Sequence, residues 1–176
     1  MNLVLIGYRG TGKSAIARKL AAMLDRQVVS LDQEIVRLSG KPIPEIVAAH
    51  GWSHFRDLEE SVCLEFGSHD GIIIDCGGGV VERDANFALL RTGGKVFWLR
   101  ATPTTIVGRI GGDDARPSLT GTKSFTEEVE EVLARRTPLY ERLAHVAIDT
   151  DGRSVDDLAA TIARKFEVAS AQGSRA

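Results

Sequence analysis

A glycine-rich stretch near the start of the chain has the residue types and the spacing that bind phosphate. The segment Gly7-Tyr8-Arg9-Gly10-Thr11-Gly12-Lys13-Ser14 fits the pattern G-x-x-x-x-G-K-[ST] in full. Glycines let the backbone turn so that successive N–H groups and a helix N-terminus surround phosphate oxygens, and the lysine ammonium reaches the transferring end. A glycine-rich turn with a chance lysine is the alternative, but the strand and helix predicted on either side disfavour it. We predict a P-loop whose nucleotide contacts are Gly10, Thr11, Gly12, Lys13, Ser14 and Ala15.

Other features must decide the class of protein, because P-loops serve GTPases, motors and small-molecule kinases alike. The sequence has no Asn-Lys-x-Asp guanine motif, and 176 residues leave little room for the appended modules of most mechanical ATPases. Both observations indicate a small kinase that uses ATP. Magnesium is the expected cofactor, with Ser14 offering its hydroxyl to the ion.

Acidic residues follow two of the predicted strands. Asp32 and Glu34 come after the strand 27–31, which we expect beside the P-loop strand, and Asp75 ends an isoleucine run. Ligands bind at such strand ends, so Asp32 would hold magnesium through water and Glu34 would accept the proton of an attacking hydroxyl. The same two acids could instead complement a helix dipole, and Asp75 could either order metal-bound water or anchor a glycine loop. These residues alone leave both alternatives open.

Four further segments carry arginines and glycines: Phe55-Arg56-Asp57-Leu58-Glu59, Gly77-Gly78-Gly79, Arg116-Pro117 and Arg136-Thr137-Pro138-Leu139-Tyr140. Each has an ordinary explanation when taken singly. Arg56 could pair only with Glu59 or Glu60, Arg136 could be solvated, and the glycines could form a mere turn. Their joint occurrence beside a complete P-loop favours a binding site for an anionic acceptor.

Taken together and in this order, these segments resemble the shikimate kinase family. The resemblance covers nearly the whole chain, from Leu3 to Phe166. It implies transfer of the ATP γ-phosphate to the 3-hydroxyl of shikimate, on the route to chorismate and the aromatic amino acids, with Mg²⁺ as cofactor. It also implies the fold of P-loop kinases that are similar to nucleoside monophosphate kinases.

The resemblance assigns roles to individual residues. Arg56 and Arg136 would clamp the substrate carboxylate, which suits a planar fork that donates two parallel hydrogen bonds. Gly77, Gly78 and Gly79 would let the acceptor approach the backbone, and Asp32 and Glu34 would also contact it. Arg116 would neutralise charge on the phosphoryl group in flight. Arg109 and Arg153 are similar in position to residues that flank adenine in the family, and Glu59 would orient Arg56.

The chain departs from the family at one acid. The family normally reads Asp-x-Asp after the second strand, whereas Glu34 holds the second position here. One added methylene displaces the carboxylate by about 1.5 Å, and positioning errors near 1 Å cost about a hundredfold in rate. The alternatives are therefore a kinase of another small hydroxy acid, such as gluconate, or a catalytically idle nucleotide-binding protein.

The order of elements predicts a doubly covered parallel sheet. Short apolar runs at 3–6, 27–31, 71–75, 95–99 and 145–148 read as strands, and helical periodicity separates them. We expect helices at 13–24, 32–38, 44–49, 53–66, 83–90, 103–110, 126–143 and 154–166. The alternation predicts an α/β fold, a three-layer α/β/α sandwich with a five-stranded parallel sheet.

Composition limits the remaining possibilities. We predict a single domain at 1–168, a lid at about 111–124 that is poor in apolar residues, and a disordered tail at 169–176. A net charge of -2 gives no broad attraction to a polyanion, so nucleic acid is not an expected partner. With two cysteines and no long apolar span, we expect a cytoplasmic protein that does not bind membranes and acts as a monomer.

Overall fold

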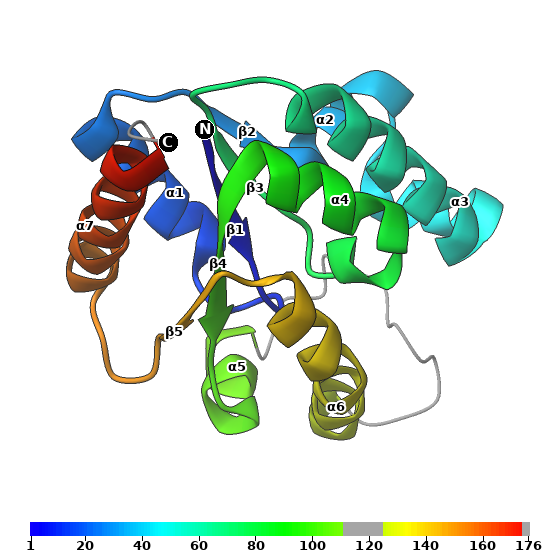
Figure 1. Cartoon of the computed structure of the whole chain (residues 1–176). Coiled ribbons are helices and arrows are strands. Elements are labelled where there is room, and N and C mark those ends of the chain that lie inside the picture. The colour runs from blue at the N-terminus through cyan, green and yellow to red at the C-terminus, as the bar shows by residue number, and fades with distance from the viewer. Residues whose placement is uncertain (111–124, 174–176) are drawn as a thin grey trace.

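Five parallel strands form a single sheet in the order β2-β3-β1-β4-β5, in a computed structural model that describes residues 1–110 and 125–173 (Figure 1). The strands are β1 (Asn2–Ile6), β2 (Val28–Ser30), β3 (Ile73–Asp75), β4 (Gly94–Arg100) and β5 (Val146–Asp149). Every neighbouring pair in the sheet runs parallel. The predicted five-stranded parallel sheet is confirmed.

The predicted place of the second strand is wrong. The sequence analysis expected it beside the P-loop strand, but β3 lies between β2 and β1. β3 is buried along its whole length, whereas β2 is only partly buried at both of its ends. A short strand with partly exposed ends suits the edge of a sheet, and a continuously apolar strand suits its centre.

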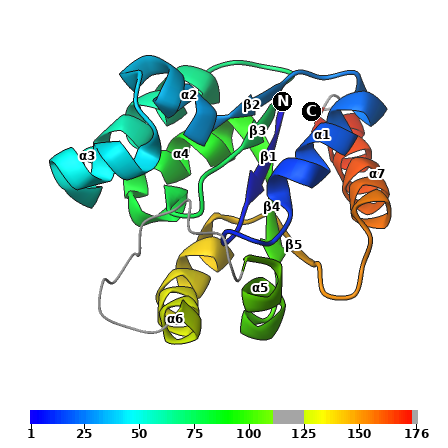
Figure 2. The ribbon, with the colours of Figure 1, turned by 180° about the vertical axis from the view of Figure 1, so that it is seen from behind.

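Helices cover both faces of the sheet. They are α1 (Lys13–Leu24), α2 (Leu31–Ser39), α3 (Ile43–Gly67), α4 (Asp84–Gly93), α5 (Pro103–Ile110), α6 (Phe125–Leu143) and α7 (Val155–Gly173), with a 3-10 turn η1 (Val80–Glu82). The helices α1 and α7 lie on one face, and α2, α3 and α4 lie on the other, as the views from both sides agree (Figures 1 and 2). The predicted three-layer α/β/α sandwich is therefore confirmed.

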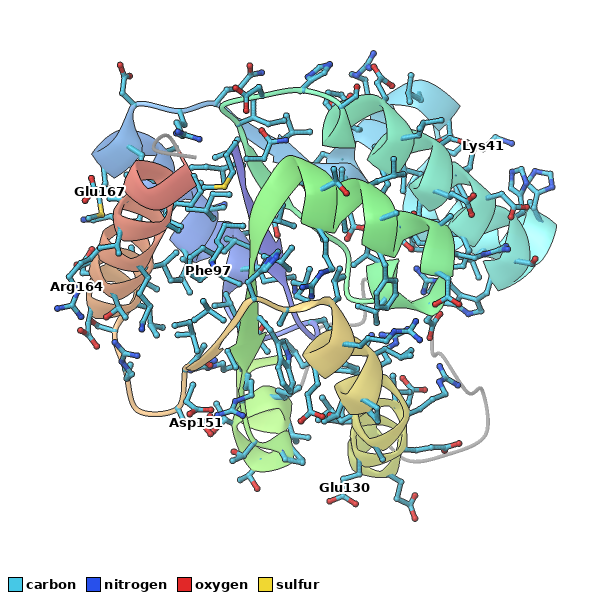
Figure 3. The ribbon with its side chains drawn as sticks, viewed as in Figure 1. Lys41, Phe97, Glu130, Asp151, Arg164 and Glu167 are labelled. Carbon is cyan, nitrogen blue, oxygen red and sulfur yellow. The ribbon has the colours of Figure 1, made fainter. Side chains whose placement is uncertain are left out.

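Strand alternation builds the two cores. Leu3 and Leu5 of β1 pack toward α1 and α7, while Val4 and Ile6 pack toward the core under α3 and α4. Figure 3 shows Phe97 of β4 in the interior, whereas Arg164 and Glu167 lie on the outer side of α7. Because a parallel sheet buries both faces, its strands read as continuous apolar runs.

Several element boundaries differ from the predictions. α3 is one assigned helix, but Gly51 inside it has φ 79° and ψ 170°, so the predicted break at this residue is confirmed. α7 continues to Gly173, so residues 169–173 of the predicted tail are helical, and the 3-10 turn at Val80–Glu82 was not predicted. The predicted lid and the last three residues lie outside the described residues. Among the helices that the structure describes, none has the length and apolarity needed to cross a membrane.

Candidate active site

The sheet register brings the predicted site residues to one level. Leu5, Asp75 and Ser30 lie side by side on β1, β3 and β2. Two positions after these residues in the sequence come Gly7, Gly77 and Asp32, respectively. Carboxyl ends of parallel strands are where such folds bind ligands, and here they carry the P-loop, the triple glycine and an acid.

The P-loop has the backbone and the lysine position that phosphate binding needs. Gly10 and Gly12 have φ of 80° and 90°, a left-handed conformation that glycine adopts without steric cost, and α1 begins at Lys13 directly after them. The Nζ atom of Lys13 donates to the carbonyl oxygens of Gly7 at 2.8 Å and Tyr8 at 3.0 Å. The lysine ammonium is thus held within its own loop, at the N-terminus of a helix where anions are favoured.

Two pockets open at the carboxyl ends of the strands. The P-loop pocket is lined by Gly10, Gly12, Lys13, Ser14, Ala15, Asp75 and Arg109, among others. The arginine pocket is lined by Trp52, Phe55, Arg56, Glu59, Gly79 and Arg136, among others. Arg9, Asp32, Gly77 and Gly78 line both pockets. The two pockets therefore meet at a shared wall that contains one carboxylate, Asp32.

The two arginines predicted to act together do converge. Arg56 comes from α3 and Arg136 from α6, and their Nε atoms each lie 3.0 Å from an oxygen of the same carboxylate, that of Glu82. Both side chains are nearly buried, with 8% and 3% of their surface exposed. Burial lowers the pKa of Arg136, but Tyr140 and Glu82 raise it by more, so it stays charged.

Glu59 forms an ion pair with Arg56, the residue that it was predicted to orient. Its Oε2 atom accepts a 2.6 Å hydrogen bond from Nη1 of Arg56, and its side chain is fully buried. Burial raises the pKa of Glu59 to about 7, although Arg56 acts in the opposite direction. The rings of Trp52 and Phe55 lie 5.4 Å and 5.2 Å from the Arg56 guanidinium carbon and add cation–π contacts.

Gly77, Gly78 and Gly79, here called the glycine shelf, lie against these charged groups. A Cβ atom on Gly79 would come within 2.1–2.3 Å of three guanidinium atoms of Arg56. A Cβ atom on Gly77 would come within 2.6 Å of Asp32 and 2.7 Å of Glu59. Only glycine permits such close approach, which gives Gly77 and Gly79 a steric reason in this fold.

Glu34 is not where the sequence analysis expected an acceptor-binding acid. Its Oε2 atom accepts a 2.7 Å hydrogen bond from Nε of Arg37 one helical turn later, and Glu34 lines neither pocket. Asp32 and Glu34 lie two positions apart on α2, so their side chains leave the helix in different directions. Of the two acids, the structure brings only Asp32 into the pockets.

Of the other residues predicted to bind the nucleotide, some line the P-loop pocket and others do not. Arg109 lines the P-loop pocket and donates to the carbonyl oxygens of Gly10 at 3.2 Å and Thr150 at 3.0 Å. Thr11 is buried and its hydroxyl donates to the carbonyl of Tyr8, so it supports the loop from inside. Arg153 does not line the P-loop pocket and is held by Asp157 and Thr161 of α7. Arg116 lies outside the described residues.

Glu82 is not among the residues predicted for the site. It lies on the unpredicted turn η1, three residues after Gly79, and it binds Arg56, Arg135 and Arg136. A single glutamate in a short turn has no periodic signal, and its three partners are 26, 53 and 54 positions away in the chain.

Comparison with known proteins decides the family. The model of the family described as shikimate kinase matches residues 9–167. The chain belongs to the shikimate kinase family. This is consistent with the paired arginines, which lie within the matched range, as does the P-loop from Arg9 onward.

Individual members of the shikimate kinase family match along most of their length. The shikimate kinase of Rhodopirellula baltica is 40% identical over 161 residues, which cover 89% of this chain and 86% of that protein. That of Thermodesulfovibrio yellowstonii is 37% identical over 166 residues, covering 94% and 95%. Among solved structures, the shikimate kinase from Acinetobacter baumannii in complex with shikimate superimposes with a TM-score of 0.90 at 31% identity, covering 95% of this chain and 93% of that one.

Proposed function

We propose that this protein is a shikimate kinase that transfers the γ-phosphoryl group of ATP to the 3-hydroxyl of shikimate. The observation that carries the proposal is the shared wall of the two pockets, which Arg9, Asp32, Gly77 and Gly78 line from both sides. A phosphate held by the P-loop and an acid held by the arginines would meet there. Membership of the family supports shikimate as the acid.

The acceptor would bind through its carboxylate. Arg56 and Arg136 present two guanidinium groups over the glycine shelf, where each can donate to one carboxylate of a small ring. Charge-assisted hydrogen bonds of this kind are roughly twice as strong as neutral ones. Because both groups are buried, their attraction for an anion is screened less by solvent than it would be at the surface.

The proton of the attacking hydroxyl requires an acceptor near the shared wall. Asp32 is the carboxylate that lies there, and we therefore propose that it, rather than Glu34, contacts the reacting hydroxyl in this conformation. Glu34 would have to leave Arg37 to act in the pocket. The substrate-binding role predicted for Glu34 stays a prediction.

The donor set at the P-loop fits magnesium. Ser14, Asp32 and Asp75 line the same pocket and offer a hydroxyl and two carboxylates, which are ligands that Mg²⁺ prefers. In the part of the chain that the structure describes, no group of three or more acidic, histidine or cysteine side chains could hold a metal by itself. When bound with ATP, the ion would neutralise charge on the nucleotide phosphates during transfer. We propose Ser14 as its direct protein contact and Asp32 as a contact through water.

The remaining roles rest on the resemblance. We propose that Lys13 binds the transferring phosphate, that Arg116 neutralises its developing charge, and that Arg109 lies beside the nucleotide. Arg153 would have to leave Asp157 to reach adenine. Since both pockets are lined by one chain, a monomer suffices for the reaction, and we propose a cytoplasmic enzyme because ATP is its co-substrate.

A coupled assay of ADP release tests the proposal. Purified protein with ATP and Mg²⁺ should release ADP when shikimate is added, and should release little with gluconate or with no acceptor. Lys13→Ala should abolish most of this activity, which excludes a contaminating kinase. Release of ADP with gluconate but not with shikimate would reassign the acceptor, and ATP binding without turnover for any acid would identify an idle protein.

A further inference from the structure

The carboxylate of Glu82 joins the two arginines of the pocket. Its Oε2 atom accepts from Nε of Arg56, and its Oε1 atom accepts from Nε of Arg136, each at 3.0 Å. Arg135 approaches the same Oε1 atom from outside, with its Nη2 atom at 2.8 Å. One side chain on η1 therefore ties α3 to α6 through their arginines.

The hydrogen bonds to Glu82 use only one edge of each guanidinium. Arg56 gives its Nε to Glu82 and its Nη1 to Glu59, and its terminal nitrogens lie against Gly79. Arg136 gives its Nε to Glu82, and its Nη1 is 3.6 Å from the position of a Cβ atom on Gly78. The Nη2 atom of Arg136 is buried and has no hydrogen-bond partner among the described residues.

Two roles are compatible with a carboxylate between two arginines. Glu82 could hold the guanidinium groups from behind, or it could occupy the place of the acceptor's carboxylate and compete with it. Glu82 does not line the arginine pocket, although both of its partners do. It also binds the Nε atoms, while the terminal nitrogens face the glycine shelf. The geometry therefore favours the supporting role.

We propose that Glu82 is a positioning residue that fixes the Nε edges of Arg56 and Arg136 and so presents their terminal nitrogens to the acceptor's carboxylate. This inference rests on the proposed function for the identity of the acceptor. Arginine is long and flexible, and a bidentate contact needs its planar fork in one orientation. An anchor shared by both arginines also fixes the spacing between the forks, which sets the size of acid that both can grip.

Steady-state kinetics of Glu82→Gln test the proposal. Glutamine keeps the shape but lacks the charge that holds two guanidinium groups. We expect the KM for shikimate to rise roughly tenfold, which corresponds to about one charge-assisted hydrogen bond, with kcat and the KM for ATP nearly unchanged. Glu82→Asp, which keeps the charge on a shorter side chain, should recover part of the loss. Glu65→Gln, at an exposed position on the same side of the sheet, is the matched control and should behave as the wild type.

The Nε–H signals of the arginines in a ¹⁵N NMR spectrum provide a readout that does not depend on turnover. Glu82→Gln should weaken the protection of the Arg56 and Arg136 signals from exchange, whereas Arg100, whose Nε donates to Asp149 at 2.7 Å, should be unaffected. A lower or unchanged KM for shikimate would overturn the proposal, the lower value identifying Glu82 as a competitor. If the wild type does not phosphorylate shikimate, the proposed function fails, and unchanged Arg56 and Arg136 signals in the variant would then overturn the role of Glu82 separately.

Discussion

At the scale of single residues, the main feature of the arginine pocket is that its buried charged side chains form ion pairs. Arg136 exposes only 3% of its side chain and contacts Glu82, while Glu59 is fully buried against Arg56. Removing a charge from water costs several kcal/mol, and an ion pair recovers that cost only with good geometry. A hydrophobic pair would often be at least as stable, so we infer that this chain keeps the arginines for binding rather than for stability.

Arg136→Lys should chiefly weaken acceptor binding. Lysine keeps the positive charge but cannot donate two parallel hydrogen bonds. The loss of one hydrogen bond to a charged group is worth about 1.5–3 kcal/mol, so the KM for shikimate should rise by about 10- to 100-fold while kcat changes less. In the same assay Lys13→Ala should show the opposite pattern, with kcat falling by about 10²–10³. If both variants lost kcat alone, the division of roles between the two pockets would be incorrect.

Glu34→Asp separates the two interpretations of this acid. In the structure Glu34 is half-buried, binds Arg37 and lines neither pocket, so we expect shikimate turnover to change by less than about threefold, which corresponds to about 0.6 kcal/mol. Asp32→Asn should instead reduce kcat strongly, because Asp32 lines both pockets. A collapse of turnover in Glu34→Asp would mean that Glu34 moves into the pocket during the reaction.

At the scale of elements, local pattern predicted more than topology. The P-loop strand, the helix after it and the break at Gly51 follow from apolar periodicity and glycine chemistry, which act over a few residues. The sheet order did not follow, because the choice between β2 and β3 as neighbour of β1 depends on which strand can bury both faces. Likewise α7 extends to Gly173, beyond the predicted end at 166. The apolar periodicity ends there, but residues 167–173 contain no proline that would stop the helix.

The glycine shelf gives a prediction at this scale. In Gly79→Ala the new methyl group would lie about where the Arg56 guanidinium now packs, with contacts of 2.1–2.3 Å. Arg56 is held by Glu59 and Glu82, so its displacement should raise the KM for shikimate at least tenfold and cost about 1–3 kcal/mol of stability. Thermal unfolding and steady-state kinetics measure both effects.

Gly108→Ala is the matched control for the shelf. A Cβ atom at this exposed helical position meets no atom of the described residues within 4 Å. The substitution should leave the KM for shikimate unchanged and should not destabilise the protein, because alanine favours helix over glycine by about 1 kcal/mol. Equal effects of the two substitutions would remove the steric explanation of the triple glycine.

At the scale of the whole molecule, the site is assembled from segments that are far apart in the chain. Motif spacing predicted many of the residues that line the two pockets, because the P-loop, the arginines and the glycines each have a recognisable local sequence. It did not predict Glu82, nor that Glu34 binds Arg37 and lines neither pocket, since both depend on how η1 and α2 pack. The fold class followed from alternation alone, whereas the partners of each charge required the three-dimensional structure.

Glu59 links the site to the stability of the whole fold. Burial raises its pKa to about 7, above its ordinary value of 4.5. Between these two values the folded state keeps a proton that the unfolded state releases, so this group's contribution to the free energy of unfolding is present below about pH 4.5 and is lost as pH rises to about 7. Chemical denaturation across this range should show a steeper decline for the wild type than for Glu59→Gln. Parallel pH profiles would mean that Glu59 has an ordinary pKa.

We propose that Arg56 and Arg136 bind the carboxylate of shikimate at the wall shared with the P-loop. A crystal structure of the wild-type protein with shikimate tests it most directly. We predict shikimate carboxylate oxygens at about 2.7–3.2 Å from terminal nitrogens of both arginines, with the 3-hydroxyl directed toward Asp32 and the P-loop. Shikimate bound elsewhere, or bound here with its carboxylate away from either arginine, would contradict the claim.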